Sequence, residues 1–282
     1  MKALIPAAGY GTRFLPASKT IPKEMLPVGA KPAIQLIVEE ALAAGADQVV
    51  IVTSPDKPSL RRHFEVDAVW HERCAKKPEV EAELTHLEEI GKRLVWTFQT
   101  EQKGLGHAVL QAAELLRCER EPVLVLLGDA LVSGEAPSAA MAAISLVHGG
   151  ASVVGLEEVP PEKVSRYGIV AGEPLVSAPS GTGFDPARVL RLTDLVEKPS
   201  VEVAPSRLAI AGRYLLDPEV FALLSTQPPG HGGEIQLTDA IRRLLSDRPV
   251  YGYRYPGRRH DIGNPAGYLE TLVAFAQSAV ST

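Results

Sequence analysis

The N-terminal segment gathers the residue types that bind a phosphate group. Gly9, Gly11 and Thr12 follow the first predicted strand, and the basic residues Arg13 and Lys23 come soon after them. Glycines let backbone N–H groups come close to an anion, and a helix start adds its dipole. The arginine and the lysine can neutralise phosphate charge, one as a planar fork and the other as a point charge. A solvated basic turn is the alternative interpretation.

Two common glycine-rich phosphate loops fit this segment poorly. The dinucleotide loop of dehydrogenases needs a third glycine where Phe14 stands, and prolines and cations crowd the stretch that follows. A Walker loop needs Gly-Lys-Ser or Gly-Lys-Thr, which does not follow here. The segment therefore indicates a phosphate loop of another type.

Two aspartates are candidates for a metal site. Asp129 follows a fully apolar run, and an aspartate at the carboxyl end of a buried strand commonly holds Mg²⁺. Asp261 lies in the sequence His-Asp-Ile-Gly and is a similar candidate. Either residue could instead cap a turn or a helix, which aspartate often does.

Polar residues also follow two further apolar runs. Glu197 and Lys198 end one of them. Because neighbouring side chains of a strand point to opposite faces, this acid and this base should meet different groups, such as a sugar hydroxyl and a phosphate. A charged strand end in solvent is the alternative. Gln99 ends the other run, where its amide can read the edge of a base, and Gly104 permits close approach.

The spacing of apolar residues predicts the elements that hold these side chains. In the first half, strands are expected at residues 3–7, 48–52, 94–98, 123–127 and 152–156, and helices at 33–44, 106–116 and 136–147. Residues 60–64 and the charged stretch that continues to about residue 92 are expected to form surface helices. This alternation predicts an α/β fold with a doubly wound, mostly parallel mixed sheet. In the second half, strands are expected at 169–170, 190–196 and 208–215, and helices at 220–224, 235–245 and 268–276.

Composition narrows the class of protein. The chain has 282 residues, of which 45% are hydrophobic and 22% charged, as in a globular protein. Its formal net charge of −5 argues against a general partner of nucleic acid or of an anionic membrane, and no apolar run is long enough to span one. Residues 1–31 nevertheless hold five basic side chains and one acid. Cys74 and Cys118 fit no disulfide or metal pattern, which favours a reducing cytoplasm.

Taken in order along the chain, these segments resemble the bacterial UTP–glucose-1-phosphate uridylyltransferases, also called UDP-glucose pyrophosphorylases. Residues 8–13 and 22–24, with Gly-Tyr-Gly-Thr-Arg and Pro-Lys-Glu, are typical of the wider sugar nucleotidyltransferase superfamily. Lys-Gly-Leu-Gly-His-Ala at 103–108 and Glu-Ile-Gln-Leu-Thr-Asp at 234–239 narrow the resemblance to the UDP-glucose branch. Further matching stretches lie at 196–199, 211–214 and 260–264.

The resemblance implies a Rossmann-like nucleotidyltransferase fold in one domain over residues 1–282. Residues 1–160 would be the nucleotide-binding half, and residues 161–282 the sugar-phosphate-binding half with the C-terminal helices. The implied site has Ala8, Gly9, Gly11 and Thr12 around the nucleoside triphosphate, Arg13 and Lys23 as catalytic groups on its phosphates, Gln99 and Gly104 at the uracil, Gly168 and Glu197 at the sugar, Lys198 on the sugar phosphate, and Asp129 and Asp261 on Mg²⁺.

The implied reaction transfers a uridylyl group from UTP to glucose-1-phosphate and gives UDP-glucose and pyrophosphate. It would proceed by Mg²⁺-assisted in-line attack on the α-phosphate, in a cytoplasmic homo-oligomer, a dimer or a tetramer. One alternative is a related enzyme that uses dTTP or another sugar-1-phosphate. Another is a nucleotide-sugar-binding paralogue without catalysis, although such paralogues tend to lose the charged groups that are present here.

Overall fold

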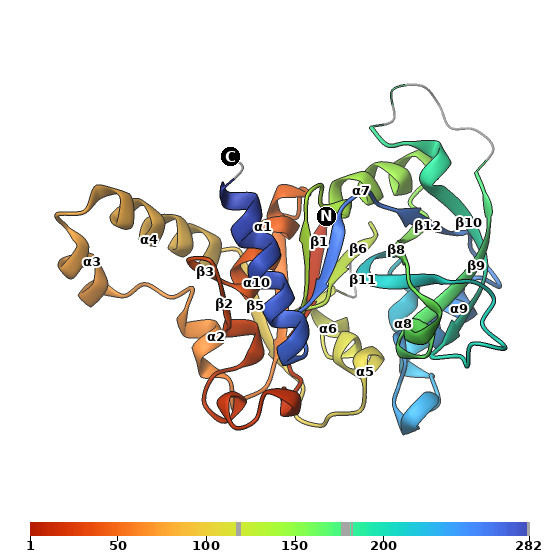
Figure 1. Ribbon diagram of the computed structural model, residues 1–282, viewed down its shortest axis with the longest axis horizontal. Coiled ribbons are helices and arrows are strands. Elements are labelled where there is room, and N and C mark those ends of the chain that lie inside the picture. The colour runs from red at the N-terminus through yellow and green to blue at the C-terminus, as the bar shows by residue number, and fades with distance from the viewer. Residues whose placement is uncertain (117–119, 176–180, 182, 281–282) are drawn as a thin grey trace.

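Figure 1 shows the computed structural model, which describes residues 1–116, 120–175, 181 and 183–280. Residues 278–280 are described by their backbone alone. Cys118 lies outside the described residues, and Cys74 is a buried free thiol. Helices flank a sheet that runs through both halves of the chain (Figure 1). None of the described helices is both long and apolar enough to cross a membrane.

The main sheet has nine strands in the order β5-β4-β1-β6-β11-β8-β12-β10-β9. Their bounds are β1 (Lys2–Pro6), β4 (Gln48–Thr53), β5 (Leu94–Phe98), β6 (Val123–Leu126), β8 (Ser152–Glu158), β9 (Gly168–Pro174), β10 (Val189–Glu197), β11 (Leu208–Leu216) and β12 (Val250–Arg254). Strands β5, β4, β1 and β6 are mutually parallel, and β12 is parallel to β8. Strands β10 and β11 run antiparallel to their neighbours.

The predicted α/β class with a mixed sheet is confirmed, but four of the eight neighbouring strand pairs in the main sheet are antiparallel. The parallel character predicted from the sequence is thus complete only from β5 to β6. A parallel pair needs a long crossover, usually a helix. Strands β9 and β10 follow one another with no α-helix among the described residues between them, and they pair antiparallel.

Helices cover both faces of the sheet. They are α1 (Ala33–Ala43), α2 (Pro58–Arg62), α3 (Ala68–Cys74), α4 (Pro78–Gly91), α5 (Leu105–Leu110), α6 (Ala113–Leu116), α7 (Pro137–Val147), α8 (Glu219–Ser225), α9 (Leu237–Leu244) and α10 (Pro265–Val280). Ile5 of β1 packs in a core with α1 and α7, whereas its neighbour Leu4 packs in a second core with α5, α8 and α9. Because successive strand residues face opposite sides, a strand covered on both faces must be apolar throughout.

Several elements differ from the prediction. The helix expected at 106–116 is broken into α5 and α6. Strand β12 and two small sheets were not predicted, the latter being β2 (Pro27–Val28) with β3 (Lys31–Pro32) and β7 (Ala130–Ser133) with β13 (Arg258–Asp261). The four strands of the small sheets have two or four residues each, too few to show a clear alternation of apolar and polar positions. The charged stretch from residue 60 to about residue 92 forms helices α2, α3 and α4, as predicted, and the last two project away from the sheet (Figure 1).

Candidate active site

Two cavities meet beyond the carboxyl ends of β1, β5 and β6. The large cavity has a volume of about 720 Å³ and the small cavity about 250 Å³. Leu105, Leu127 and Asp129 line both of them. The two cavities are therefore parts of one elongated site, in the place where open α/β sheets bind their ligands.

The small cavity is lined by five residues that the sequence assigned to a nucleotide or its phosphates. They are Ala8 and Gly9 from the loop after β1, Lys23 from a 3₁₀ turn at Lys23–Met25, Gln99 after β5, and Gly104. Gln99 is buried, and its amide nitrogen donates to the carbonyl oxygen of Gly104 at 3.3 Å. The carboxyl ends of neighbouring parallel strands thus bring distant segments to one cavity.

Gly104 stands where only a glycine fits. Its φ is +100°, and a Cβ atom there would lie 2.7 Å from the Cβ of Glu234 and 2.9 Å from the carbonyl oxygen of Ile235. The same two segments are joined by backbone hydrogen bonds of 2.8 Å, from the N–H of Gly106 to the carbonyl of Ile235 and from the N–H of Ile235 to the carbonyl of Lys103. The start of α5 and the segment before α9 are therefore held in direct contact.

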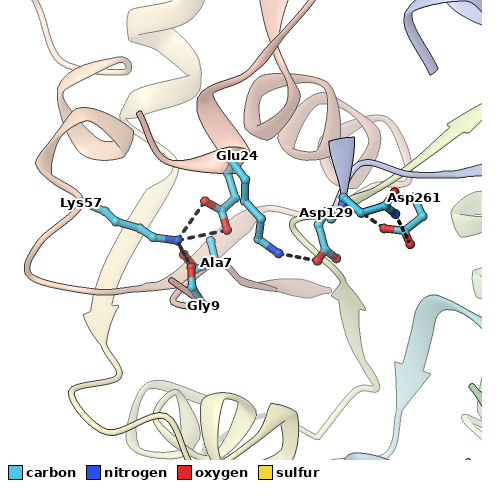
Figure 2. Close-up of polar contacts among 9 residues, drawn as sticks. Ala7, Gly9, Glu24, Lys57, Asp129 and Asp261 are labelled. Carbon is cyan, nitrogen blue, oxygen red and sulfur yellow. Dashed lines mark hydrogen bonds and ion pairs between the residues drawn. The ribbon is translucent and has the colours of Figure 1, made fainter. Parts of the chain in front are cut away.

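Lys23 forms an ion pair with Asp129, which lines both cavities. Figure 2 labels Asp129 and draws this contact as a dashed line. Burial acts to lower the pKa of Lys23, but the carboxylates of Asp129 and Glu24 outweigh it and raise that pKa above its ordinary value. Burial likewise acts to raise the pKa of Asp129, and the Lys23 ammonium outweighs it and holds that pKa below its ordinary value. Both side chains are therefore charged at neutral pH.

Asp261 comes to Asp129 through the pairing of β13 with β7, which sets Asp261 opposite Ala130. The N–H of Gly263 donates to Asp261 Oδ1 at 2.7 Å. A Cβ atom on Gly263 would lie 2.9 Å from Asp261 Oδ1 and 3.1 Å from Asp129 Oδ2, so both carboxylates face one point of the backbone.

Two carboxylates facing one point, beside a cavity that can take phosphate, fit the needs of a hard cation such as Mg²⁺. No group of three His, Cys, Asp or Glu residues that could hold a metal occurs in the described part of the chain. Phosphate oxygens and water would therefore have to supply the remaining ligands of a cation held by Asp129 and Asp261.

The large cavity holds the residues expected at a sugar phosphate. Gly168 and Glu197 are paired in the β9–β10 register, and Lys198 follows β10. The hydroxyl of Thr238 donates to Glu197 Oε2 at 2.7 Å. A Cβ atom on Gly168 would lie 2.9 Å from that hydroxyl oxygen and 3.2 Å from Glu197 Oε2. The glycine therefore leaves room for the carboxylate that faces the cavity.

Glu197 and Lys198 do not face opposite sides, contrary to the expectation from strand alternation. Lys198 has a φ of +45°, which ends the extended backbone of β10. Its Nζ lies 3.3 Å from Glu197 Oε1, and both side chains line the large cavity. The left-handed residue is the physical reason for the difference, because strand alternation applies only while the backbone stays extended.

Three of the residues predicted for the triphosphate lie apart from the small cavity. Arg13 lines the large cavity instead. Gly11 and Thr12 line neither of the two cavities among the described residues. Gly11 has a φ of +65°, and a Cβ atom added there would lie 3.5 Å from the Cβ of Ser18. It shapes the loop that carries the arginine.

The sequence did not single out Lys57, Gln102, Thr238 or Arg259. Lys57 Nζ donates to the carbonyl oxygens of Ala7 at 2.8 Å and Gly9 at 2.6 Å, and pairs with Glu24 (Figure 2). Arg259 lines the large cavity and its guanidinium lies 4.5 Å from the centre of the Tyr167 ring. The strand-end rule could have found Lys57, which follows the last residue of β4 by four positions.

The chain is similar along nearly its whole length to proteins of known family. The family model of nucleotidyl transferases matches residues 2–278, and the chain belongs to this family. It is 43% identical to a UTP–glucose-1-phosphate uridylyltransferase of Staphylococcus haemolyticus and 42% identical to one of Staphylococcus epidermidis, each over 98% of this chain and 92% of the relative.

Solved structures agree with that assignment to a family. A UDP-glucose pyrophosphorylase complexed with UDP-glucose superposes with a TM-score of 0.84 at 40% identity over 98% of both chains. A UTP-bound UGPase from Acinetobacter baumannii superposes with a TM-score of 0.81 at 35% identity, over 97% of this chain and 92% of the other. The fold predicted from the sequence resemblance is thus that of solved members of the family.

Proposed function

We propose that this chain transfers a uridylyl group from UTP to glucose-1-phosphate and releases UDP-glucose and pyrophosphate. The observation that carries the proposal is the junction at Asp129, where a small cavity lined by glycine loops opens into a large cavity lined by Glu197 and Lys198. One end suits a nucleotide and the other a sugar phosphate. The names of relatives that are 42% and 43% identical over nearly the whole chain support the same reaction.

The chemistry asks chiefly for alignment and charge neutralisation. An oxygen of the sugar phosphate attacks the α-phosphorus, and pyrophosphate leaves in line with it. Because two anions must approach, the site has to offset their charge and fix their geometry. A phosphate oxygen is already nucleophilic, so the reaction needs no strong general base.

In this proposal the small cavity binds UTP. The loop at Ala8 and Gly9, continued by Gly11 and Thr12, follows the triphosphate, while Gln99 and Gly104 contact the uracil. The Lys23 ammonium, which stays charged beside Asp129, offsets charge on the α-phosphate and the leaving pyrophosphate. Arg13 offsets phosphate charge from the side of the large cavity.

The large cavity takes glucose-1-phosphate. Gly168 and Glu197 meet the sugar, with the carboxylate held by Thr238, and the Lys198 ammonium meets the sugar phosphate. Asp129 and Asp261 are the residues that would hold Mg²⁺. When bound there, the ion would supply positive charge to the phosphate oxygens. We further propose that residues 1–282 act as one nucleotidyltransferase domain; the homo-oligomeric state and the cytoplasmic location stay predictions.

The test is a pyrophosphate-release assay that crosses four nucleoside triphosphates with several sugar-1-phosphates. We expect release with UTP and glucose-1-phosphate at a rate well above that of dTTP, or of galactose- or N-acetylglucosamine-1-phosphate. Faster release with another pair would overturn the substrate assignment within the family. Binding of UDP-glucose without release from any pair would identify a non-catalytic paralogue instead.

A further inference from the structure

The first three carbonyl groups of the loop after β1 all accept hydrogen bonds from side chains. Lys57 Nζ donates to the carbonyl oxygens of Ala7 and Gly9, and Gln102 Nε2 donates to that of Ala8 at 3.2 Å. The N–H groups of Ala8 and Gly9 donate to no other backbone group within the described residues. The loop therefore has its acceptors engaged and these donors available.

Lys57 is enclosed by the protein. Its side chain is 7% exposed, and that of its partner Glu24 is 1% exposed. The ammonium has three hydrogens, and its acceptors are two carbonyl oxygens and the carboxylate of Glu24, whose oxygens lie at 3.1 and 2.9 Å. Glu24 supplies the counter-charge without which a buried ammonium would be costly.

This geometry separates Lys57 from Lys23. Lys23 lines the small cavity, whereas Lys57 lines neither cavity among the described residues. With its hydrogens directed at protein acceptors, Lys57 has none to offer a phosphate. Its effect on a ligand must pass through the backbone that it holds, at Ala7 and Gly9 (Figure 2).

Resting on the proposed function, we propose that Lys57 is a positioning residue of the phosphate loop, which is the loop after β1. It determines that N–H groups of this loop, and not its carbonyl groups, face the phosphates. By drawing two carbonyl oxygens inward, it keeps them away from the triphosphate, whose oxygens would repel them. It also leaves the loop's N–H groups to face those oxygens, as in other anion-binding backbone segments. Without the ammonium, the carbonyls of Ala7 and Gly9 would be unsatisfied and would turn toward the water of the small cavity.

The test compares the binding of UTP with that of uridine, which lacks the phosphates. Lys57→Met keeps an unbranched side chain that is one atom shorter and removes the ammonium with its donors. We expect the Kd of UTP, measured by titration calorimetry, to rise by about tenfold or more, and the Kd of uridine to change by less than about twofold. Lys57→Arg, which restores donors, should recover part of the UTP affinity. Lys92→Met, at a lysine with 66% exposure, is the matched control and should change neither Kd.

A second variant covers the case in which Lys57→Met does not fold. Gln102→Ala frees the carbonyl of Ala8 and also removes a side chain that lines the small cavity. We expect it to weaken UTP binding by a smaller factor than Lys57→Met does, and to weaken UTP binding more than uridine binding. The proposal would be overturned if either variant raised the Kd of UTP and the Kd of uridine by the same factor. It would also be overturned if folded Lys57→Met bound UTP with unchanged affinity. Because the readout is binding, a wild-type protein that binds UTP but releases no pyrophosphate would refute the proposed function and not the role of Lys57.

Discussion

Lys23 holds its charge where phosphate groups are expected, and it does so in spite of burial. Two carboxylates, those of Asp129 and Glu24, raise its pKa above the ordinary value. A lysine with a raised pKa does not release its proton near neutral pH, so its contribution is electrostatic. At the scale of single residues, the site thus works by fixed charges that are held in place by neighbours.

Replacing Lys23 tests that charge directly. We expect Lys23→Ala to lower kcat by about 10²-fold or more, because it removes one positive group that the proposed function places at the reacting phosphates. Initial rates of pyrophosphate release measure the loss, and a thermal melt checks that the protein stays folded. Lys31→Ala is the control, since this ammonium pairs with Glu39 at 2.9 Å and lines neither cavity. A near-normal rate in Lys23→Ala would refute its catalytic role.

Replacing Thr238 tests the proposed sugar end of the site. Thr238→Val removes the hydroxyl that donates to Glu197 and changes the shape of the side chain little. We expect the KM for glucose-1-phosphate to rise by about tenfold and the KM for UTP to stay the same, because only one end of the site loses its support. Thr85→Val, whose hydroxyl donates to a helix carbonyl on the surface, is the control. A parallel rise of both KM values would contradict the assignment.

At the scale of elements, the two ends of the site are tied together. The N-terminus of α5 and the segment before α9 share two backbone hydrogen bonds of 2.8 Å through Ile235. Gly104 and Gly106 allow this close approach, because a Cβ atom at either position would lie less than 3.0 Å from Ile235. We therefore expect a shift at the proposed nucleotide end to displace the residues that line the proposed sugar end.

Gly106→Ala tests the tie between these elements. Its new Cβ would lie 2.8 Å from the carbonyl oxygen of Ile235 and 2.8 Å from Leu224 Cδ2, so the two segments must separate. We expect the KM values for both substrates to rise severalfold in steady-state assays. Gly149→Ala is the control for a loss of stability alone. The φ of +68° at this position makes alanine about 1–2 kcal/mol less stable than glycine, but no atom lies within 4 Å of the new Cβ, so both KM values should stay the same. A change in only one KM would show that the ends are independent.

At the scale of the whole molecule, one buried ion pair joins the two halves of the chain. Arg213 of β11 is fully buried, and its Nε and Nη2 donate to the two carboxylate oxygens of Glu40 on α1 at 2.9 and 2.6 Å. Ser138 of α7 donates to the same carboxylate at 2.5 Å. Strand β11 is thereby fixed against helices of the first half, in the middle of a sheet that both halves build.

Glu40→Gln should lower the free energy of unfolding at pH 7 by about 3 kcal/mol, because it leaves a buried guanidinium without its counter-charge. Burial acts to raise the pKa of Glu40, but Arg213 outweighs it and holds that pKa below the ordinary 4.5. The pair therefore stabilises the fold fully above pH 4.5, and the stabilisation is lost as the pH falls through the folded-state pKa.

Urea unfolding of both proteins from pH 7 down to about pH 3.5 measures this dependence. The difference between wild type and Glu40→Gln should shrink at the acid end, whereas a constant difference would contradict the ion-pair explanation. Glu158→Gln is the control, because Glu158 pairs with Arg207 on the surface. The side chains of Glu158 and Arg207 are 50% and 57% exposed. We expect that control to change the free energy of unfolding by less than about 1 kcal/mol.

Much of this protein could be predicted from its sequence because the information was local. The continuous apolar runs of β1, β4 and β6 predict strands that are buried on both faces, and such strands end where ligands bind. The ends of β1 and β6 select Ala8 and Asp129, and the end of the partly buried β5 selects Gln99. The α/β class and the positions of most helices follow from the same periodicity.

Only the tertiary structure decided which of these residues meet. Asp261 reaches Asp129 through two four-residue strands, β7 and β13, which are too short to give a clear pattern, and Thr238 of α9 reaches Glu197 at the end of β10. Lys57 acquires its role from carbonyl groups that lie 50 and 48 residues away in the chain. Local sequence fixes the backbone conformation and the ends of strands, because propensities act over a few residues. Contacts across tens of residues depend on how whole elements pack, and the type of a residue does not carry that information.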